Sequence, residues 1–331
     1  MKQLLTILLL SGFTAMFAQP KTGYDFKKAG DYNNFIVEQQ QAVTLKNIVY
    51  ISKAAHSKND NKIEARRNEL VAQIKEGINK VSKMPTFEGD ETFKTKALDY
   101  FETMLNIFNG DYKEINQLSN KVDENQKQKK CNDAVNDIMQ QYLDLQTVAE
   151  TKLATASDEM DEAQVKFAEK QGMTLKATDD GKKMGKLIAQ ISEVNVYHRQ
   201  IDMEMFKNST ARLCLSAAWD AKNVAEFEES RTKLLEASEA SLAEIKKMSA
   251  FKGDDSYLQA AKTMLFYFSN LAKGDFVKVG EFLAKEQKDV TKADVDTYNK
   301  IIQSYNKKNA EVINDYNKAM THFMEKHIPK A

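Results

Sequence analysis

Apolar residues recur at intervals of three and four along most of the chain, and this spacing predicts amphipathic α-helices. The longest such stretch runs from residue 131 to residue 167, and residues 295–323 repeat its pattern. A 3.5-residue repeat held over this length predicts coiled-coil-like, knobs-into-holes packing against neighbouring helices. Asn309 takes one apolar position of the second stretch, where we expect a buried polar group that fixes the register.

Four helices are expected in the first half of the chain. The first two cover residues 31–56 and 62–83, the third begins at Asp90 and ends before Gly110, and the fourth covers residues 131–167. The third carries a single apolar stripe, which consists of Phe93, Ala97, Phe101, Met104 and Phe108. Amphipathic helices joined by short turns predict an antiparallel four-helix bundle.

The same arrangement is expected twice, because residues 83–111 align without a gap with residues 247–275, at an offset of 164. Nine of these 29 positions are identical, where chance would give about two at typical residue frequencies. Residues 165–170 also match residues 321–326, at an offset of 156. Solenoid repeats have periods of roughly 20–50 residues, so a longer period indicates a duplicated domain. We therefore predict an all-α fold of two tandem antiparallel four-helix bundles that arose by internal duplication.

The chain divides accordingly into five expected segments. Residues 1–18 are a signal peptide, and residues 19–30 form an N-terminal linker. The first helical bundle covers residues 31–170. The polar residues 171–183 form a linker, and the second bundle covers residues 184–331.

Two short turn motifs occur in both copies and are the most recognisable local feature. Their shared residues are Phe87, Gly89, Asp90, Gly110 and Asp111 in the first copy, and Phe251, Gly253, Asp254, Gly274 and Asp275 in the second. We interpret them as structural: Gly supplies a positive φ, Asp caps the next helix, and the aromatic ring packs over the turn. The alternative is that the Asp residues contact a cation or a partner.

The N-terminus has the pattern of a secretory signal peptide. Lys2 precedes an apolar run from Leu4 to Leu10, and Ala18 lies directly before the expected cleavage site. The apolar run is shorter than the roughly 18 residues that a transmembrane helix needs. We therefore expect an extracytoplasmic protein, in the periplasm, at the cell surface or secreted, without a transmembrane span after cleavage.

Composition excludes some classes of function. The chain has 48 Lys and Arg against 48 Asp and Glu, a formal net charge of zero. A nucleic-acid binder needs a basic patch, and a polybasic membrane contact needs clustered Lys and Arg. The 3 Pro and 12 Gly in 331 residues are few, as expected of a protein of long helices.

Catalytic and metal-binding residues find little support in the pattern. No His lies three residues after a Glu, which is the spacing of di-metal centres in helical bundles. His322, Glu325 and His327 are weak zinc candidates, but structural zinc normally takes four ligands, so we interpret them as a solvated C-terminal turn. His198 falls within an apolar stripe and is interpreted as a core residue. We expect no cofactor and no catalytic site.

The two cysteines allow one disulfide. Cys131 begins the fourth helix of the first copy, and Cys214 lies late in the first helix of the second. An oxidising compartment permits a bond between them, which would join the two bundles. Two separately buried thiols are the alternative, because the sequence does not establish the required approach of the two Cα atoms.

The signal peptide, which ends Phe17-Ala18-Gln19, resembles those common in Bacteroidota. The repeated Phe-x-Gly-Asp segments, each followed by a Gly-Asp-aromatic turn, resemble a family of secreted all-helical surface or envelope proteins of Bacteroidota and spirochaetes. The resemblance covers nearly the whole mature chain. It implies a secreted helical protein and supplies no activity and no functional residues.

These patterns lead to one expected function and two alternatives. We expect a non-enzymatic helical-bundle protein of the bacterial envelope, a partner-binding or structural module whose partner is a protein or envelope component. The first alternative is a protein that binds a small apolar or amphipathic ligand inside one bundle, because the third and fourth helices are rich in aromatic residues and Met. The second, a hydrolase with an unrecognised site, ranks last.

Overall fold

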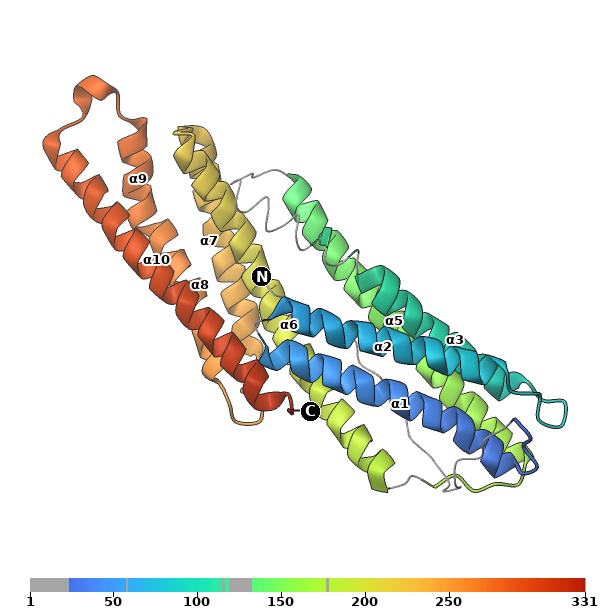
Figure 1. Cartoon of the computed structure of the whole chain (residues 1–331). Coiled ribbons are helices and arrows are strands. Elements are labelled where there is room, and N and C mark those ends of the chain that lie inside the picture. The colour runs from blue at the N-terminus through green and yellow to red at the C-terminus, as the bar shows by residue number, and fades with distance from the viewer. Residues whose placement is uncertain are drawn as a thin grey trace. The chain divides into compact units, whose positions relative to one another are not determined.

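The computed structural model describes residues 24–57, 59–112, 114, 117–118, 133–176 and 179–330 (Figure 1). The elements before α6 are α1 (Ala29–His56), α2 (Asp60–Ser82), α3 (Thr92–Asn106), the short π-helix η1 (Ile107–Asp111) and α5 (Asp133–Lys170). They are followed by α6 (Asp179–Asp220), α7 (Val224–Lys247), α8 (Ser256–Lys273), α9 (Asp275–Ala284), the 3-10 helix η2 (Gln287–Asp289) and α10 (Lys292–His327).

The all-α class that the apolar periodicity predicts is confirmed. The described residues contain no β-strand, and their β pairing is limited to two isolated bridges, Phe87 with Asp90 and Phe251 with Asp254. Within the same part of the chain, none of the helices combines the length and the apolar character that a membrane span requires.

The chain forms two compact units. Of the described residues, the first unit contains those up to 118 together with 141–194 and 327–330, and the second contains 133–140 and 195–326. Helix α6 therefore contributes its first part to the first unit and its second part to the second unit. The end of the chain belongs to the first unit, where the carbonyl of Ile328 lies 2.8 Å from Nε2 of His56.

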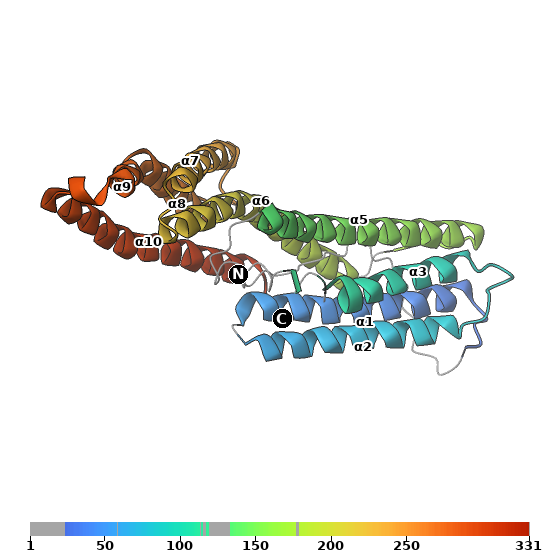
Figure 2. The same cartoon turned by 90° about the horizontal axis from the view of Figure 1, so that it is seen from above.

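In the first unit, α1 packs along α2, and α2 along α3 (Figure 2). Apolar side chains of all three helices are buried without solvent exposure, for example Ile36, Ile74 and Phe101, and Leu153 of α5 is equally buried. Helix α2 begins where Asn59 accepts a hydrogen bond from the backbone N–H of Lys62 at 3.0 Å, which satisfies one of the unpaired N–H groups of a helix start.

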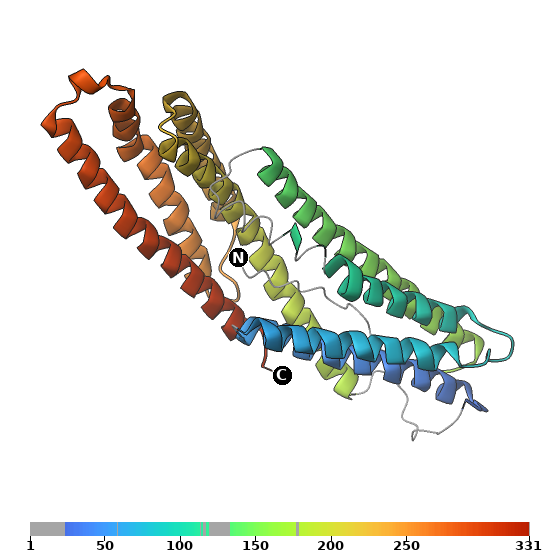
Figure 3. The same ribbon diagram turned by 45° about the horizontal axis from the view of Figure 1, so that its top comes forward.

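In the second unit, α7 packs against α8 and α9, and α10 runs along α8 and α9 (Figure 3). Helix α10 contacts α9 through the stacked rings of Tyr298 and Phe282, whose centroids are 4.4 Å apart. Helix α10 starts with a reciprocal capping box, in which Thr291 Oγ1 accepts from the N–H of Asp294 and Asp294 Oδ2 accepts from the N–H of Thr291.

Candidate functional site

The two Phe-x-Gly-Asp segments form tight reversals between consecutive helices. The N–H of Phe87 donates to the carbonyl of Asp90 at 3.2 Å, and the N–H of Asp90 donates to the carbonyl of Phe87 at 2.9 Å. The central residues Glu88 and Gly89 have φ of +49° and +77°. Two consecutive positive φ angles are typical of a type I′ hairpin turn. Residues 251–254 have the same bonds, both at 2.9 Å, with φ of +49° at Lys252 and +85° at Gly253.

Both Asp side chains bond to the start of the next helix. Asp90 Oδ1 accepts from the N–H of Thr92 at 2.9 Å, and Asp254 Oδ1 accepts from the N–H of Ser256 at 3.1 Å. The helix itself begins at Thr92, later than the predicted start at Asp90. The reason is that the backbone N–H and C=O of Asp90 are already paired with Phe87 across the turn.

A lysine from α5 in the first unit, and one from α10 in the second, pairs with the turn Asp. Lys170 Nζ lies 2.9 Å from Asp90 Oδ2, and Lys326 Nζ lies 2.8 Å from Asp254 Oδ2. The hydrogen bond from Lys170, followed by the N–H of Thr92, lowers the pKa of the Asp90 carboxyl. The aspartates thus bond to a helix start and to a lysine within their own unit.

The turn phenylalanines are buried among aromatic rings. Phe87 contacts Phe167 with ring centroids 5.7 Å apart, and Tyr32 contacts both. The second unit has the same arrangement. Phe251 and Phe323 have centroids 5.3 Å apart, and Tyr197 contacts both rings. Each turn is therefore held by one ion pair and one aromatic cluster.

Gly110 and Gly274 were expected to have a positive φ, and neither does. Gly110 lies inside the π-helix η1 and is not among the positive-φ residues, so the chain passes it without leaving helical geometry. Gly274 has φ of −121°, and a Cβ at this position would lie 3.3 Å from the carbonyl oxygen of Asn270. Glycine is needed there for close backbone approach instead. Asp111 is the last residue of η1, and Asp275 is the first residue of α9.

The cysteine prediction stays open. Cys214 lies in α6, and no described cysteine is a free thiol. Cys131 lies outside the described residues, so its pairing with Cys214 stays a prediction.

The histidines do not assemble a metal site. His322 and Glu325 are exposed on α10, and His327 ends that helix. In the part of the chain that the structure describes, no three His, Cys, Asp or Glu side chains come together as metal ligands. His198 bonds through Nδ1 to the hydroxyl of Tyr257 at 3.0 Å, and burial lowers the pKa of its imidazole. Tyr257 in turn lies 3.1 Å from the hydroxyl of Tyr316, which makes a short buried polar chain.

The second unit contains a cavity of about 380 Å³. Its floor consists of the buried apolar residues Leu215, Leu234, Phe268 and Phe276, each with at most 3% of its surface exposed. The exposed residues Asp220, Lys222 and Asn306 form the rim. The other lining residues, from α6 and α10, are half-buried: Arg212, Ser216, Trp219, Tyr298, Ile302 and Tyr305.

Aromatic rings form one wall of this cavity. Trp219 lies against Phe276 and Tyr305, with ring centroids 5.5 and 5.8 Å away. Its Nε1–H donates to the hydroxyl of Tyr298 at 3.0 Å. The indole is therefore fixed in orientation. Aromatic and apolar walls with a few placed polar groups are typical of small-molecule sites.

Arg212 is a charged residue of the cavity lining, and its described neighbours supply no hydrogen-bond acceptor for its Nε–H. Its guanidinium lies over the ring of Phe268, with Cζ 4.1 Å from the ring centroid. Its Nε is buried, and no described residue accepts a hydrogen bond from it. Burial lowers the pKa of Arg212, and the groups that oppose this effect are the hydroxyls of Tyr305 and Tyr267, not a carboxylate.

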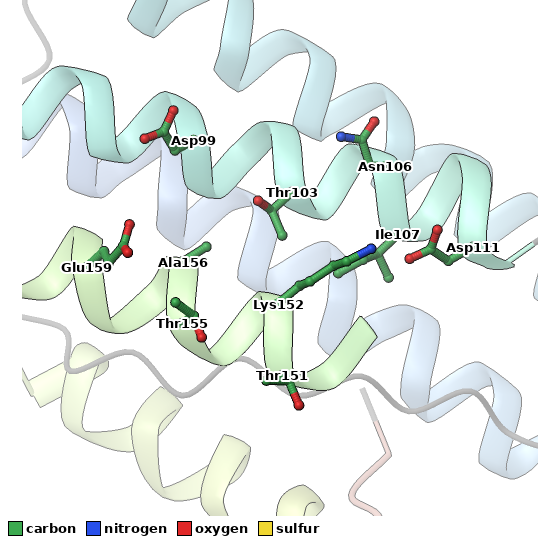
Figure 4. Close-up of a pocket in the computed structure, with 10 residues that line it drawn as sticks. All are labelled: Asp99, Thr103, Asn106, Ile107, Asp111, Thr151, Lys152, Thr155, Ala156 and Glu159. Carbon is green, nitrogen blue, oxygen red and sulfur yellow. The ribbon is translucent and has the colours of Figure 1, made fainter. Parts of the chain in front are cut away.

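A groove of about 510 Å³ lies in the first unit between α3 and α5 (Figure 4). Asp99, Asn106, Thr151, Lys152 and Glu159 are exposed around it. Figure 4 shows Lys152 extending from α5 toward Ile107. The lining contains no aromatic ring and no buried charge, so it has the character of solvated surface, and the cavity at Arg212 is the stronger candidate site.

Arg212 and Trp219 were not predicted as site residues. One signal was available, because both continue the apolar stripe of Ile201 and Met205 at helical spacing. A charged residue at such a position requires a partner.

The chain matches no protein-family model, no curated protein and no solved structure.

We predict that Gly253→Ala lowers the free energy of unfolding by about 1–2 kcal/mol, because an L-residue is strained at positive φ. Gly185→Ala is the matched control. Gly185 lies within α6, and a Cβ there meets nothing within 4 Å. This change should raise stability by about 0.5–1 kcal/mol through helix propensity. Urea unfolding followed by circular dichroism measures both, and a shift of the same sign in both would contradict the turn assignment.

We also predict that Asp90→Asn lowers stability at pH 7 by about 0.5 kcal/mol, because the exposed partner Lys170 limits the strength of the pair. Because the folded-state pKa of Asp90 lies below its ordinary value of 3.8, its contribution is present above that value. The contribution is lost as the pH falls through the folded-state pKa. The difference between variant and wild type should therefore shrink in acid. Lys170→Met in both backgrounds completes a double-mutant cycle, and strictly additive effects would exclude the pair.

Proposed function

We propose that this protein is a secreted, non-enzymatic binding protein of the bacterial envelope, and that its second unit holds a small amphipathic ligand. The observation that carries the proposal is the cavity of about 380 Å³ with its aromatic wall and buried apolar floor. Its volume lies within the range of roughly 300–1,000 Å³ that is typical of ligand pockets. The cavity opens to solvent at its rim, and its apolar floor with a few polar groups above it supports a binding role.

Binding fits the lining better than catalysis does. The lining residues include one carboxylate, Asp220, and no histidine or cysteine. General acid–base or nucleophilic catalysis needs a pair of such groups within hydrogen-bond reach. The hydrolase alternative therefore has the least support. The extracytoplasmic location rests on the signal-peptide pattern of residues 1–18, which lie outside the described residues.

The proposal includes the duplication and the two four-helix bundles. Equivalent contacts recur at the offsets that the sequence alignment gives. Arg67 Nη1 donates to the carbonyl of Phe108 at 2.6 Å, and Arg231 Nη1 donates to the carbonyl of Ala272 at 2.9 Å. The partners are 41 residues apart in both cases. The turns, their lysines and their aromatic clusters agree with the same alignment, which supports a common ancestor for the two units.

The two copies have diverged at the cavity. The positions 164 and 165 residues before Trp219 hold Ala55 and Ala54, which have no ring to form an aromatic wall. In the first unit, the rings of Tyr50, Phe108 and Tyr112 pack together instead, and Tyr50 and Phe108 are buried. We infer that the second copy acquired the ligand site and that the first kept a filled core.

A partner-binding or structural module was the first expectation from the sequence. The exposed large apolar residues of the described chain lie on five helices and in the segment before α1, and they are Tyr24, Leu45, Val148, Val165, Val196, Met203, Phe266 and Val295. Single exposed apolar residues are ordinary on protein surfaces. The cavity is the more specific feature, and we therefore rank ligand binding first.

We predict that decan-1-ol binds the wild-type protein saturably and changes the fluorescence of Trp219, the sole tryptophan of the sequence. Ser216→Phe should weaken this binding at least about tenfold, because a phenyl ring would occupy the cavity and displace the contacts of several buried CH₂ groups, each worth about 0.8 kcal/mol. Ser304→Phe is the matched control, since Ser304 is exposed on α10 and does not line the cavity.

Two results would contradict the proposed function. One is the absence of a saturable response to decan-1-ol and to decanoate in the wild type. The other is equal affinity in wild type and Ser216→Phe, which would place the bound molecule elsewhere. An equal loss in Ser304→Phe would show that the effect of the bulky residue is not specific to the cavity.

A further inference from the structure

The half-buried Arg212 differs from Arg67, which is buried, and from Arg231, which is half-buried. Arg67 is bonded to the carboxylate of Glu64 and to the carbonyl of Phe108, and Arg231 is bonded to Glu228 and to the carbonyl of Ala272. Both guanidinium groups thus have a carboxylate and a backbone acceptor. Arg212 has neither among the described residues, and its closest partner is the face of the Phe268 ring.

The buried Nε–H of Arg212 has no acceptor among the described residues, so an acceptor from outside the chain would stabilise it. Removal of a cation from water is unfavourable unless hydrogen bonds or an opposite charge compensate. The ring of Phe268 supplies a cation–π contact, but it accepts none of the five N–H donors that a guanidinium carries. The acid of the lining, Asp220, belongs to the exposed rim, where Lys222 also lies.

The cavity lining places a charged group next to apolar side chains. Arg212 stands over the buried ring of Phe268, and the remaining wall consists largely of rings and aliphatic side chains. Trp219 uses its Nε1–H on the hydroxyl oxygen of Tyr298. Arg212 is therefore a charged donor that faces a molecule in the cavity beside the apolar floor of Leu215, Leu234 and Phe268.

We propose that the cavity of the second unit binds a small apolar carboxylate, whose head group pairs with Arg212 and whose apolar body lies against Trp219 and Tyr305. This inference rests on the proposed function and names its ligand class. A carboxylate fits because its two oxygens match the planar fork of a guanidinium and form two parallel, charge-assisted hydrogen bonds.

The comparison with the first unit supports a specific role for this arginine. The positions 164 and 165 residues before Arg212 hold Ile48 and Asn47, neither of which is charged. Arg67 of the first unit and Arg231 of the second are equivalent, because they are 164 residues apart and each bonds to a backbone carbonyl 41 residues further on. Arg212 is thus found in the copy that has the aromatic cavity, together with Trp219.

The test compares decanoate with decan-1-ol at pH 7.5, which share a chain length and differ in head group. Trp219 fluorescence reports binding of both. We expect the wild type to bind decanoate about 10- to 100-fold more tightly than decan-1-ol, the range for hydrogen bonds to charged groups. Arg212→Met should abolish this preference and leave the affinity for decan-1-ol within about threefold, because Met keeps the length and apolar character of the side chain.

Arg231→Met is the matched control, because it removes a second arginine of the same unit that does not line the cavity. It should reduce the stability of the free protein and leave the preference for decanoate unchanged. Arg212→Met should leave the melting temperature of the free protein unchanged or raise it, since replacement of an unpaired buried charge by an apolar group relieves its desolvation. Arg212→Lys, which keeps the charge without the fork, should retain part of the preference.

The outcomes separate the two proposals. Equal wild-type affinity for decanoate and decan-1-ol would overturn the carboxylate inference and leave the ligand-binding function in place. A decanoate preference that persists in both Arg212→Met and Arg212→Lys would also overturn it. The absence of saturable binding of either compound would overturn the proposed function itself. A large fall in the melting temperature of Arg212→Met would show that Arg212 is paired in the free protein, and this result would overturn the inference as well.

Discussion

The fold depends on the aromatic contact between each tight turn and a long helix of its unit, α5 in the first unit and α10 in the second. Phe87 packs against Phe167 of α5, and Phe251 packs against Phe323 of α10. Each contact buries two rings between the turn and the helix. Long amphipathic helices gain most of their stability from tertiary packing rather than from their own hydrogen bonds. The type I′ turn places the ring, the Asp side chain bonds to the start of the next helix, and a lysine neutralises the carboxylate. Each of these local features positions the same contact.

The helical class and much of the helix layout follow from the sequence, because stripes such as Phe93, Ala97, Phe101 and Met104 report one buried face. The positive φ at Gly89 and Gly253 was also predictable from residue chemistry. The predicted N-caps Asp90 and Asp254 were wrong by one residue, because the N-caps are Glu91 and Asp255. The geometry at Gly110 was not, since a π-helix and a helix end have similar local sequences. The cavity could not be predicted either. A stripe of aromatic residues in the sequence indicates a buried face. Whether the space beside Trp219 is filled depends on how side chains from five helices pack together, which the stripe does not show.

Under the proposed function, the two units differ in the packing that each keeps around its aromatic rings. A filled aromatic core around Tyr50 and Phe108 gains dispersion contacts on every side of each ring. A cavity beside Trp219 gives up some of those contacts, and an unpaired guanidinium adds a desolvation penalty. Proteins commonly accept such local losses at functional sites, where a bound molecule restores them. The absence of charge at Asn47 and Ile48 fits a first unit with a mainly structural task.

The ion pairs at the turns also bear on the rate at which each unit opens. Lys170 and Asp90 are 80 residues apart in the chain, and Lys326 and Asp254 are 72 apart. The neighbouring helix pairs α2–α3 and α7–α8 are local in sequence and can form early, whereas contacts that close long loops are slow to form. Interactions that form after the folding transition state mainly determine the unfolding rate. Helices α5 and α10 are then expected to form their contacts with the turns late in folding, and these contacts are expected to set how slowly each unit unfolds.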